Sequence, residues 1–152
     1  MNKLKQLYQK LTANPNAVEA IAYLIFGVLT TLVNWAVYFG LTALLVKGEG
    51  GQDALWLNLS NAVAWVLSVL FAYVTNKRYV FKSTAKHAAA GRELLLFFTA
   101  RLGSYFLFDV GLYNLLVVVF SLHHAPVKIV ANVCVVAFNY VASKWGIFKK
   151  GQ

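Results

Sequence analysis

Four long apolar stretches separated by short polar ones dominate the chain. They cover residues 20–46, 54–75, 94–120 and 126–146. Each exceeds the roughly 20 residues that an α-helix needs to cross a hydrocarbon core about 30 Å thick. The connections at 47–53 and 121–125 are short, and only residues 82–93 form a longer polar connection. The pattern predicts an all-α membrane protein built from two helical hairpins.

The ends of the second and fourth stretches repeat one aromatic and basic pattern. A shift of 67 positions pairs Phe71 with Phe138, Tyr73 with Tyr140, Lys77 with Lys144, and Phe81 with Phe148. A shift of 75 positions aligns the first and third stretches and pairs Asn34 with Asp109. Both halves run in the same direction, so we predict a parallel repeat of two similar hairpins.

Residues 1–19 are more polar than the stretch that follows. Lysines alternate with leucines and a tyrosine at helical spacing here, which predicts a short amphipathic helix on the cytoplasmic membrane surface. Asn14, Pro15 and Asn16 are expected to break this helix before the first span.

Composition agrees with a membrane protein. The chain is 60% hydrophobic and 12% charged, with a mean hydropathy of +0.63, whereas soluble domains average about 45–50% apolar and about 25% charged residues. Two prolines and no low-complexity tract favour a single domain over residues 1–152. The one cysteine, Cys134, excludes an intrachain disulfide.

Basic residues predict the orientation. With four spans, all but two of the 14 lysines and arginines fall on one side, and the exceptions are Lys47 and Lys128. The positive-inside rule then places both termini and the central connection in the cytoplasm, as in a multi-pass protein of the cytoplasmic membrane. Anionic lipid headgroups account for the net charge of +9, so no nucleic-acid partner is expected.

Polar residues within the spans must find partners inside the bundle, because lipid offers none. Helical spacing predicts an interior polar set of Asn34, Asn76, Tyr105, Asp109, Asn132 and Asn139. This set would either line a polar cavity or hold the helices together by hydrogen bonds. Asp109 is the strongest single candidate, since a carboxylate near a helix centre costs roughly 2.5–3.5 kcal/mol on insertion scales.

Four cations are predicted at one depth, at the cytoplasmic surface. They are Lys77, Arg78, Arg101 and Lys144. Arginine offers a planar fork to phosphate and lysine a point charge, so they could bind a lipid phosphate. The alternative is an ordinary basic anchor at the membrane surface.

The sequence shows no catalytic constellation. It has five carboxylates, no Gly-rich phosphate loop and no acidic pair suited to a metal, and its three histidines lack metal-ligand spacing. We therefore expect no enzyme activity, no cofactor and no metal.

Four segments carry a resemblance to the GtrA-like family of small four-span membrane proteins. They are YLIFGVLTTLVNWAVYFGL in the first span, NKRYVFK after the second, Arg101 at the start of the third, and NYVASKWGIF after the fourth. The resemblance covers about residues 20 to 149. Family members often have Asn where this chain has Asp109.

This resemblance implies a flippase-type carrier of a polyprenyl-phosphate-linked sugar for cell-surface or cell-wall glycosylation, working with membrane lipids and a membrane glycosyltransferase. The four cations would capture the phosphate, and Asn34, Asp109 and Asn139 would bind sugar hydroxyls. Two alternatives stay open: a non-transporting anchor or accessory subunit of a glycosyltransferase, and a small cation or drug transporter. Four spans are few for enclosing a path, so a homo-oligomer is expected.

Overall fold

The computed structural model describes residues 13–45 and 54–148, except for the side chains of Ala54, Asp109 and Ala125. All regular structure in these ranges is helical. The chain divides into two units, Met1–Val80 and Phe81–Gln152.

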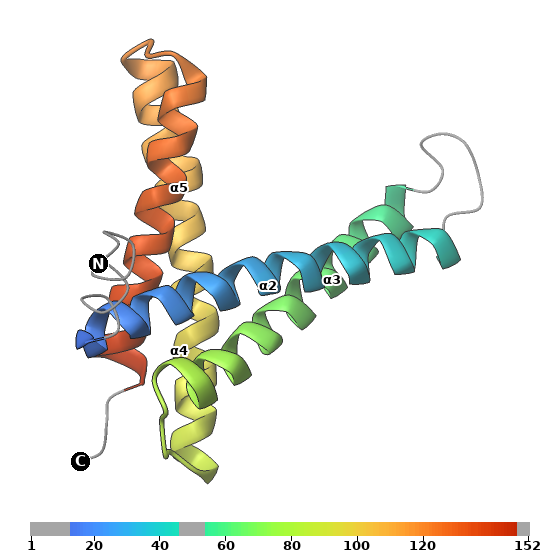
Figure 1. The fold of residues 1–152 in the computed structure, drawn as a ribbon. Helices are drawn as coiled ribbons and strands as arrows, with labels where there is room; N and C mark the ends of the chain where they lie inside the picture. Colours follow the sequence, from blue (N-terminus) through green and yellow to red (C-terminus); the bar gives the residue numbers. More distant parts are fainter. Residues whose placement is uncertain (1–12, 46–53, 149–152) are drawn as a thin grey trace, which may run out of the picture. The chain divides into compact units, whose positions relative to one another are not determined.

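Each unit is a helical hairpin (Figure 1). The first contains α2 (Pro15–Leu45), α3 (Ala54–Thr75) and the π-helical segment η2 (Asn76–Val80). The second contains α4 (His87–Ser104), the π-helical η3 (Tyr105–Leu112) and η4 (Leu115–Val119), then α5 (His124–Val141) and the π-helical η5 (Ala142–Ile147).

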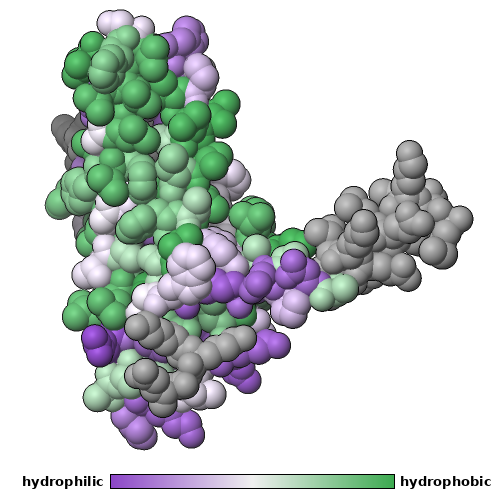
Figure 2. Space-filling view, turned by 90° about the vertical axis from the view of Figure 1, so that its left-hand side faces the viewer, coloured by the Kyte–Doolittle hydropathy of each residue, from purple (hydrophilic) through white to green (hydrophobic). Residues whose placement is uncertain are grey.

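Four helical stretches in the described residues are long and apolar enough to cross a membrane, which confirms the predicted fold class. They are Pro15–Leu45, Leu55–Val80, His87–Val119 and Pro126–Ile147. Large apolar side chains such as Val28, Phe106 and Val118 are more than 60% exposed. Hydrophobic surface accordingly covers most of the length of the α4–α5 hairpin (Figure 2). A continuous apolar surface of this size fits lipid contact rather than water.

The first span begins earlier than its hydrophobicity indicates. Asn14 lies outside the helix, and its Oδ1 accepts a hydrogen bond from the backbone N–H of Asn16 at 3.0 Å. Pro15 then occupies the first helical position, where its missing N–H costs nothing. Of the three residues predicted to break the helix, Asn14 alone is non-helical, and Pro15 and Asn16 already belong to α2. The amphipathic helix predicted before it falls on residues 1–12, which lie outside the described residues.

The central connection is shorter than the predicted polar segment. Helix α4 begins at His87, because alanines 88–90 and Glu93 are good helix formers even though they are not apolar enough to extend the span. Non-helical backbone is left only at residues 81–86. Lys82 and His87 mark the two ends of this turn with left-handed φ values of 52° and 49°.

The π-helical segments were not anticipated from the sequence. At the end of α3, the Thr75 hydroxyl donates to the carbonyls of Phe71 and Ala72, at 2.8 and 3.1 Å. The Asn76 amide donates to the same Ala72 carbonyl at 2.7 Å. Side chains therefore occupy backbone acceptors at the point where α-helical pairing gives way to η2.

Segments η2 and η5 occupy matching places in the two halves. The 67-residue shift moves positions 76–80 onto 143–147, which lie inside η5. The buried residues correspond as well, since Val80 and Phe81 pair with Ile147 and Phe148. The two hairpins thus share a detailed ending as well as a similar sequence.

Candidate functional site

A buried aromatic cluster lies near the end of the second hairpin that holds both the start of α4 and η5. Phe81 and Phe148 stack with ring centroids 5.2 Å apart. Tyr140 lies 6.1 Å from Phe81, and Phe97 lies 5.8 Å from Phe148. The three phenylalanines are at most 2% exposed. We call these four residues the aromatic cluster.

Two of the predicted phosphate-binding cations lie on this aromatic cluster. The Arg101 guanidinium is 5.0 Å from the Phe97 ring centroid. The Lys144 ammonium is 5.4 Å from the Tyr140 centroid and donates a hydrogen bond to the Tyr140 hydroxyl at 3.2 Å. Both cations are half-buried. The second unit therefore holds Arg101 and Lys144 against one aromatic cluster.

The other two predicted cations lie in the first unit, in η2. The Lys77 ammonium is 5.7 Å from the ring centroid of Tyr73, and the Arg78 guanidinium is 5.8 Å from that of Tyr79. Tyr79 in turn stacks on Phe26 at 5.5 Å. Lys77 over Tyr73 matches Lys144 over Tyr140, since in both pairs the lysine comes four positions after the tyrosine. Two of the four cations therefore belong to the first unit and two to the second.

Asn139 joins the two helices of the second hairpin. Its Nδ2 donates to the Ser104 hydroxyl at 2.9 Å, and that hydroxyl donates to the Arg101 backbone carbonyl at 2.9 Å. Asn139 is 2% exposed and Ser104 is fully buried. This pairing satisfies polar groups that lipid could not, so Asn139 holds the helices together.

Asn76 has a different environment at the corresponding end of the first hairpin. The residue is 1% exposed, and its Nδ2 donates a hydrogen bond to the Ala72 carbonyl. Its Oδ1 has no hydrogen-bond partner among the described residues. A buried acceptor left in this state costs free energy unless a donor reaches it.

The remaining members of the predicted interior polar set differ in their exposure. Asn34 is half-buried in α2, whereas Tyr105 and Asn132 are exposed. Asp109 belongs to η3, and its side chain lies outside the described part of the chain. Among the described residues, no group of three or more His, Cys, Asp and Glu could hold a metal ion.

Glu93 was not among the predicted site residues, yet it is only 7% exposed on the first turns of α4. The Ser83 hydroxyl donates to Glu93 Oε1 at 2.5 Å and accepts from the Ala85 N–H at 3.3 Å. The carboxylate therefore ties the central connection to α4. Its position, directly before the apolar run that starts at Leu94, is the signal that could have marked it.

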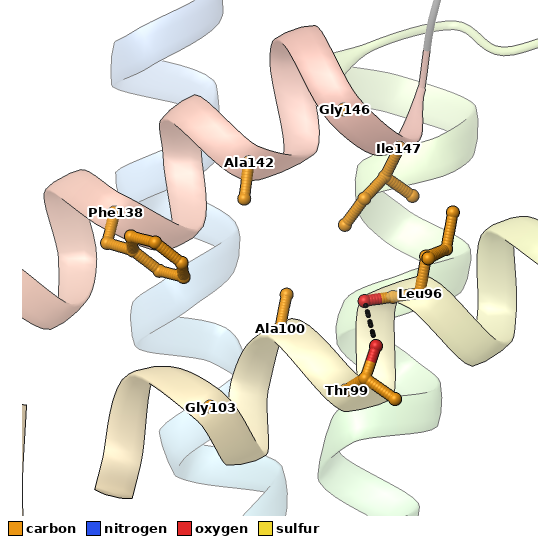
Figure 3. A pocket seen from close by; sticks show the side chains of 8 residues that line it. All are labelled: Leu96, Thr99, Ala100, Gly103, Phe138, Ala142, Gly146 and Ile147. Atoms are coloured by element: carbon orange, nitrogen blue, oxygen red, sulfur yellow. Dashed lines mark hydrogen bonds between the residues drawn. The ribbon is translucent and has the colours of Figure 1, made fainter. Parts of the chain in front are cut away.

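An apolar groove of about 320 Å³ runs between α4 and the α5–η5 helix, near the aromatic cluster (Figure 3). Ala100 and Gly103 line one wall, and Phe138 and Ala142 line the other. The one hydroxyl among its lining residues, on Thr99, donates to the Leu96 carbonyl at 3.0 Å. The groove offers van der Waals contact but no convergent polar groups, so it is not suited to a sugar or a phosphate.

Comparisons with known proteins agree with this architecture. The family model described as GtrA/DPMS, transmembrane domain, matches residues 22–148. A relative from Listeria monocytogenes serovar 1/2a (strain ATCC BAA-679 / EGD-e), named cell wall teichoic acid glycosylation protein GtcA, is 39% identical over 98% of both chains. GtcA of Listeria innocua serovar 6a is 38% identical over 98% of both chains.

A relative from Bacillus subtilis (strain 168), named uncharacterized membrane protein YwcD, is 40% identical over 84% of this chain and 94% of its own. No solved structure matches the chain. The helices and the matches together define a multi-pass membrane protein. The chain belongs to the GtrA/DPMS transmembrane-domain family, which confirms the resemblance seen in the sequence.

Proposed function

We propose that this protein carries a polyprenyl-phosphate-linked sugar across the cytoplasmic membrane for glycosylation of a cell-surface polymer. In this proposal both termini and the central connection face the cytoplasm, where the lipid-linked sugar is captured. The protein supplies a membrane glycosyltransferase on the far side and performs no bond chemistry itself. Membership of the family and the printed names of the Listeria relatives support the pathway.

The observation that carries the proposal is the placement of Arg101 and Lys144 on one buried aromatic cluster. A ring attracts a cation without neutralising its charge, so both groups stay able to bind an anion. Arginine can bind two phosphate oxygens with its planar fork, and lysine adds a mobile donor. A phosphate headgroup fits this combination, and the exposed apolar helix surfaces suit its polyprenyl tail.

Sugar hydroxyls need polar partners once they leave water. Asn34 and Asp109 would supply some of these along the path, whereas Asn139 is 2% exposed and gives its amide donor to Ser104. The buried Oδ1 of Asn76 adds an acceptor without a partner among the described residues, next in sequence to Lys77. A hydroxyl donor reaching this atom would remove the cost of leaving it unpaired.

The test is translocation of a defined polyprenyl-phosphate sugar by the purified protein in liposomes. Wild-type protein should move the lipid, and Arg101→Ala should weaken binding about 10- to 150-fold, the equivalent of a charge-assisted contact worth roughly 1.5–3 kcal/mol. Lys86→Ala is the matched control, because it removes an exposed charge of the same sign from the central connection. Equal weakening by both substitutions would reduce the cations to a surface anchor.

One observation favours a second candidate, a non-transporting subunit that stabilises a glycosyltransferase. Asn139 uses its amide to hold helices together, which a structural subunit also needs. That candidate predicts cells that require the protein for glycosylation although the purified protein moves no lipid. It also predicts that the basic residues of the connection are required while Asp109 is dispensable.

A further inference from the structure

Lys128 is a cation for which the proposed function has no role. It is the only lysine or arginine between Arg101 and Lys144 in the sequence. It lies in the second turn of α5, whereas Lys144 lies in η5 beyond the other end of that helix. The two are 16 residues apart, or about 24 Å along a helix, which approaches the thickness of a hydrocarbon core of about 30 Å.

Lys128 has a cation–ring contact of similar length to those at the other end of the hairpin, but its ring comes from the preceding helix. Its ammonium lies 5.8 Å from the ring centroid of Tyr113, compared with 5.4 Å between Lys144 and Tyr140. Tyr113 is half-buried and Lys128 is exposed, so the ring holds a cation that a ligand can reach. One helical hairpin thus has a lysine–tyrosine pair at each end.

A polar stripe connects the two ends along α5. Asn132 is one turn from Lys128, and Asn139 follows seven residues later, so the three residues share one helical face. Asn132 is exposed, whereas Asn139 is buried against Ser104. The stripe is therefore open at the Lys128 end and closed by packing towards Lys144.

We propose that Lys128 and Tyr113 form a second phosphate site, which receives the headgroup of the lipid-linked sugar in the far leaflet. The inference rests on the proposed function. A carrier that binds an anionic headgroup at one membrane face needs a cation to compensate the phosphate charge at the other face, where the headgroup is released. Lys128 would bind a phosphate oxygen, and the Tyr113 ring would hold the ammonium at the membrane boundary. The Asn132 amide lies within reach along the same face for a sugar hydroxyl.

The test measures binding separately at each face of proteoliposomes that contain the full-length chain in one orientation. The probe is a water-soluble, short-chain prenyl-phosphate sugar added to one face only. Lys128→Gln should raise its half-saturating concentration at the far face about tenfold, the low end for a lost charge-assisted contact, and leave the near face unchanged. Arg101→Ala should do the opposite, and Lys128→Arg should retain far-face binding. Lys86→Gln is the control for loss of an exposed charge.

Three results would overturn the site. Lys128→Gln could bind equally well from the far face, or Lys128→Arg could fail although it folds and inserts. Phosphatidylglycerol in the vesicles could compete as strongly as the lipid-linked sugar, which would make Lys128 a general lipid anchor. The proposed function fails separately: if wild-type protein moves no lipid while Lys128→Gln still loses far-face binding, the site stands and the transport proposal falls.

Discussion

Asn76 and Asn139 are asparagines near the end of the second span of their hairpins, yet their side-chain amides have different hydrogen-bond partners. Asn139 gives its donor to Ser104 on the partner helix, whereas Asn76 bonds its own helix and leaves Oδ1 unpaired among the described residues. The sequence predicted that both residues are interior, and both are buried. It could not predict their partners, because these depend on which side chain the packing brings opposite.

Tyr105 and Asn132 were predicted in the interior on the same helical spacing, but they are exposed. One physical cause applies to both. The faces that contact lipid are as apolar as those that pack, so a membrane helix gives little contrast between inside and outside.

Substitutions of Asp109 distinguish a hydrogen-bonding role for this residue from a role in carrying protons or cations. If it acts as a hydrogen-bonding group, Asp109→Asn should keep most lipid-linked sugar transport in liposomes, since Asn has the same shape and adds donors. Asn34, its counterpart in the repeat, already has an amide. Asp109→Leu should insert and fold, because removing an acid relieves an insertion cost, but it should lose transport.

The alternative function, a cation transporter, predicts that Asp109→Asn is inactive. A carboxylate that carries protons or cations cannot be replaced by Asn, so an inactive Asp109→Asn variant that is folded and inserted would sink the hydrogen-bonding role. A fully active Asp109→Leu variant would show instead that Asp109 is dispensable.

The helices themselves were largely predictable, because a span must be long and apolar enough to cross the membrane. Helix α3 has the predicted bounds of 54 and 75. The start of α4 at His87 was not predictable from hydrophobicity, since its first turns are helical without being apolar. The π-helical segments were missed for another reason: apolar periodicity does not record them, and at η2 they coincide with side-chain bonds from Thr75 and Asn76 to backbone carbonyls.

The contact between Ser83 and Glu93 should decide how firmly the central connection holds to α4. Glu93→Ala removes a buried acceptor that binds the Ser83 hydroxyl, so thermal unfolding in detergent should show a loss of roughly 1.5–3 kcal/mol. Glu93→Gln should recover part of it, because the amide keeps an acceptor oxygen. Arg92→Ala is a neighbouring exposed control.

A double-mutant cycle identifies the contact. Once Glu93 is alanine, Ser83→Ala should cost less than in the wild-type chain, because the bond between the two side chains is already lost and only the acceptor of the Ala85 N–H remains to be removed. Strictly additive losses would show that Glu93 stabilises the unit through other contacts. Trypsin cleavage at Lys82 should also become faster in Glu93→Ala than in Arg92→Ala.

At the scale of the whole molecule, two hairpins share one ending: a π-helical turn, a lysine over a tyrosine four residues earlier, and a buried phenylalanine just beyond. Both hairpins also expose large apolar side chains. Lipid can cover such surfaces, and so can a second copy of the chain, which keeps the expected homo-oligomer a prediction. The parallel repeat requires that the two shared endings lie at the same membrane face.

That requirement is tested by the topology of the chain in the cell membrane. The background is Cys134→Ser, which removes the only native thiol. Single substitutions Lys86→Cys, in the central connection, and Gln152→Cys, at the C-terminal end, should react with an impermeant thiol reagent only after the cytoplasmic face is opened. Gly50→Cys should react in intact cells, because residues 47–53 are predicted to connect the first two spans on the far side. The physical reason is the charge distribution: all but two of the 14 lysines and arginines lie on the predicted cytoplasmic side. Labelling of Gly50→Cys and Lys86→Cys from one face would contradict the four-span topology, and exchange of the two faces would reverse the predicted orientation while leaving the repeat intact.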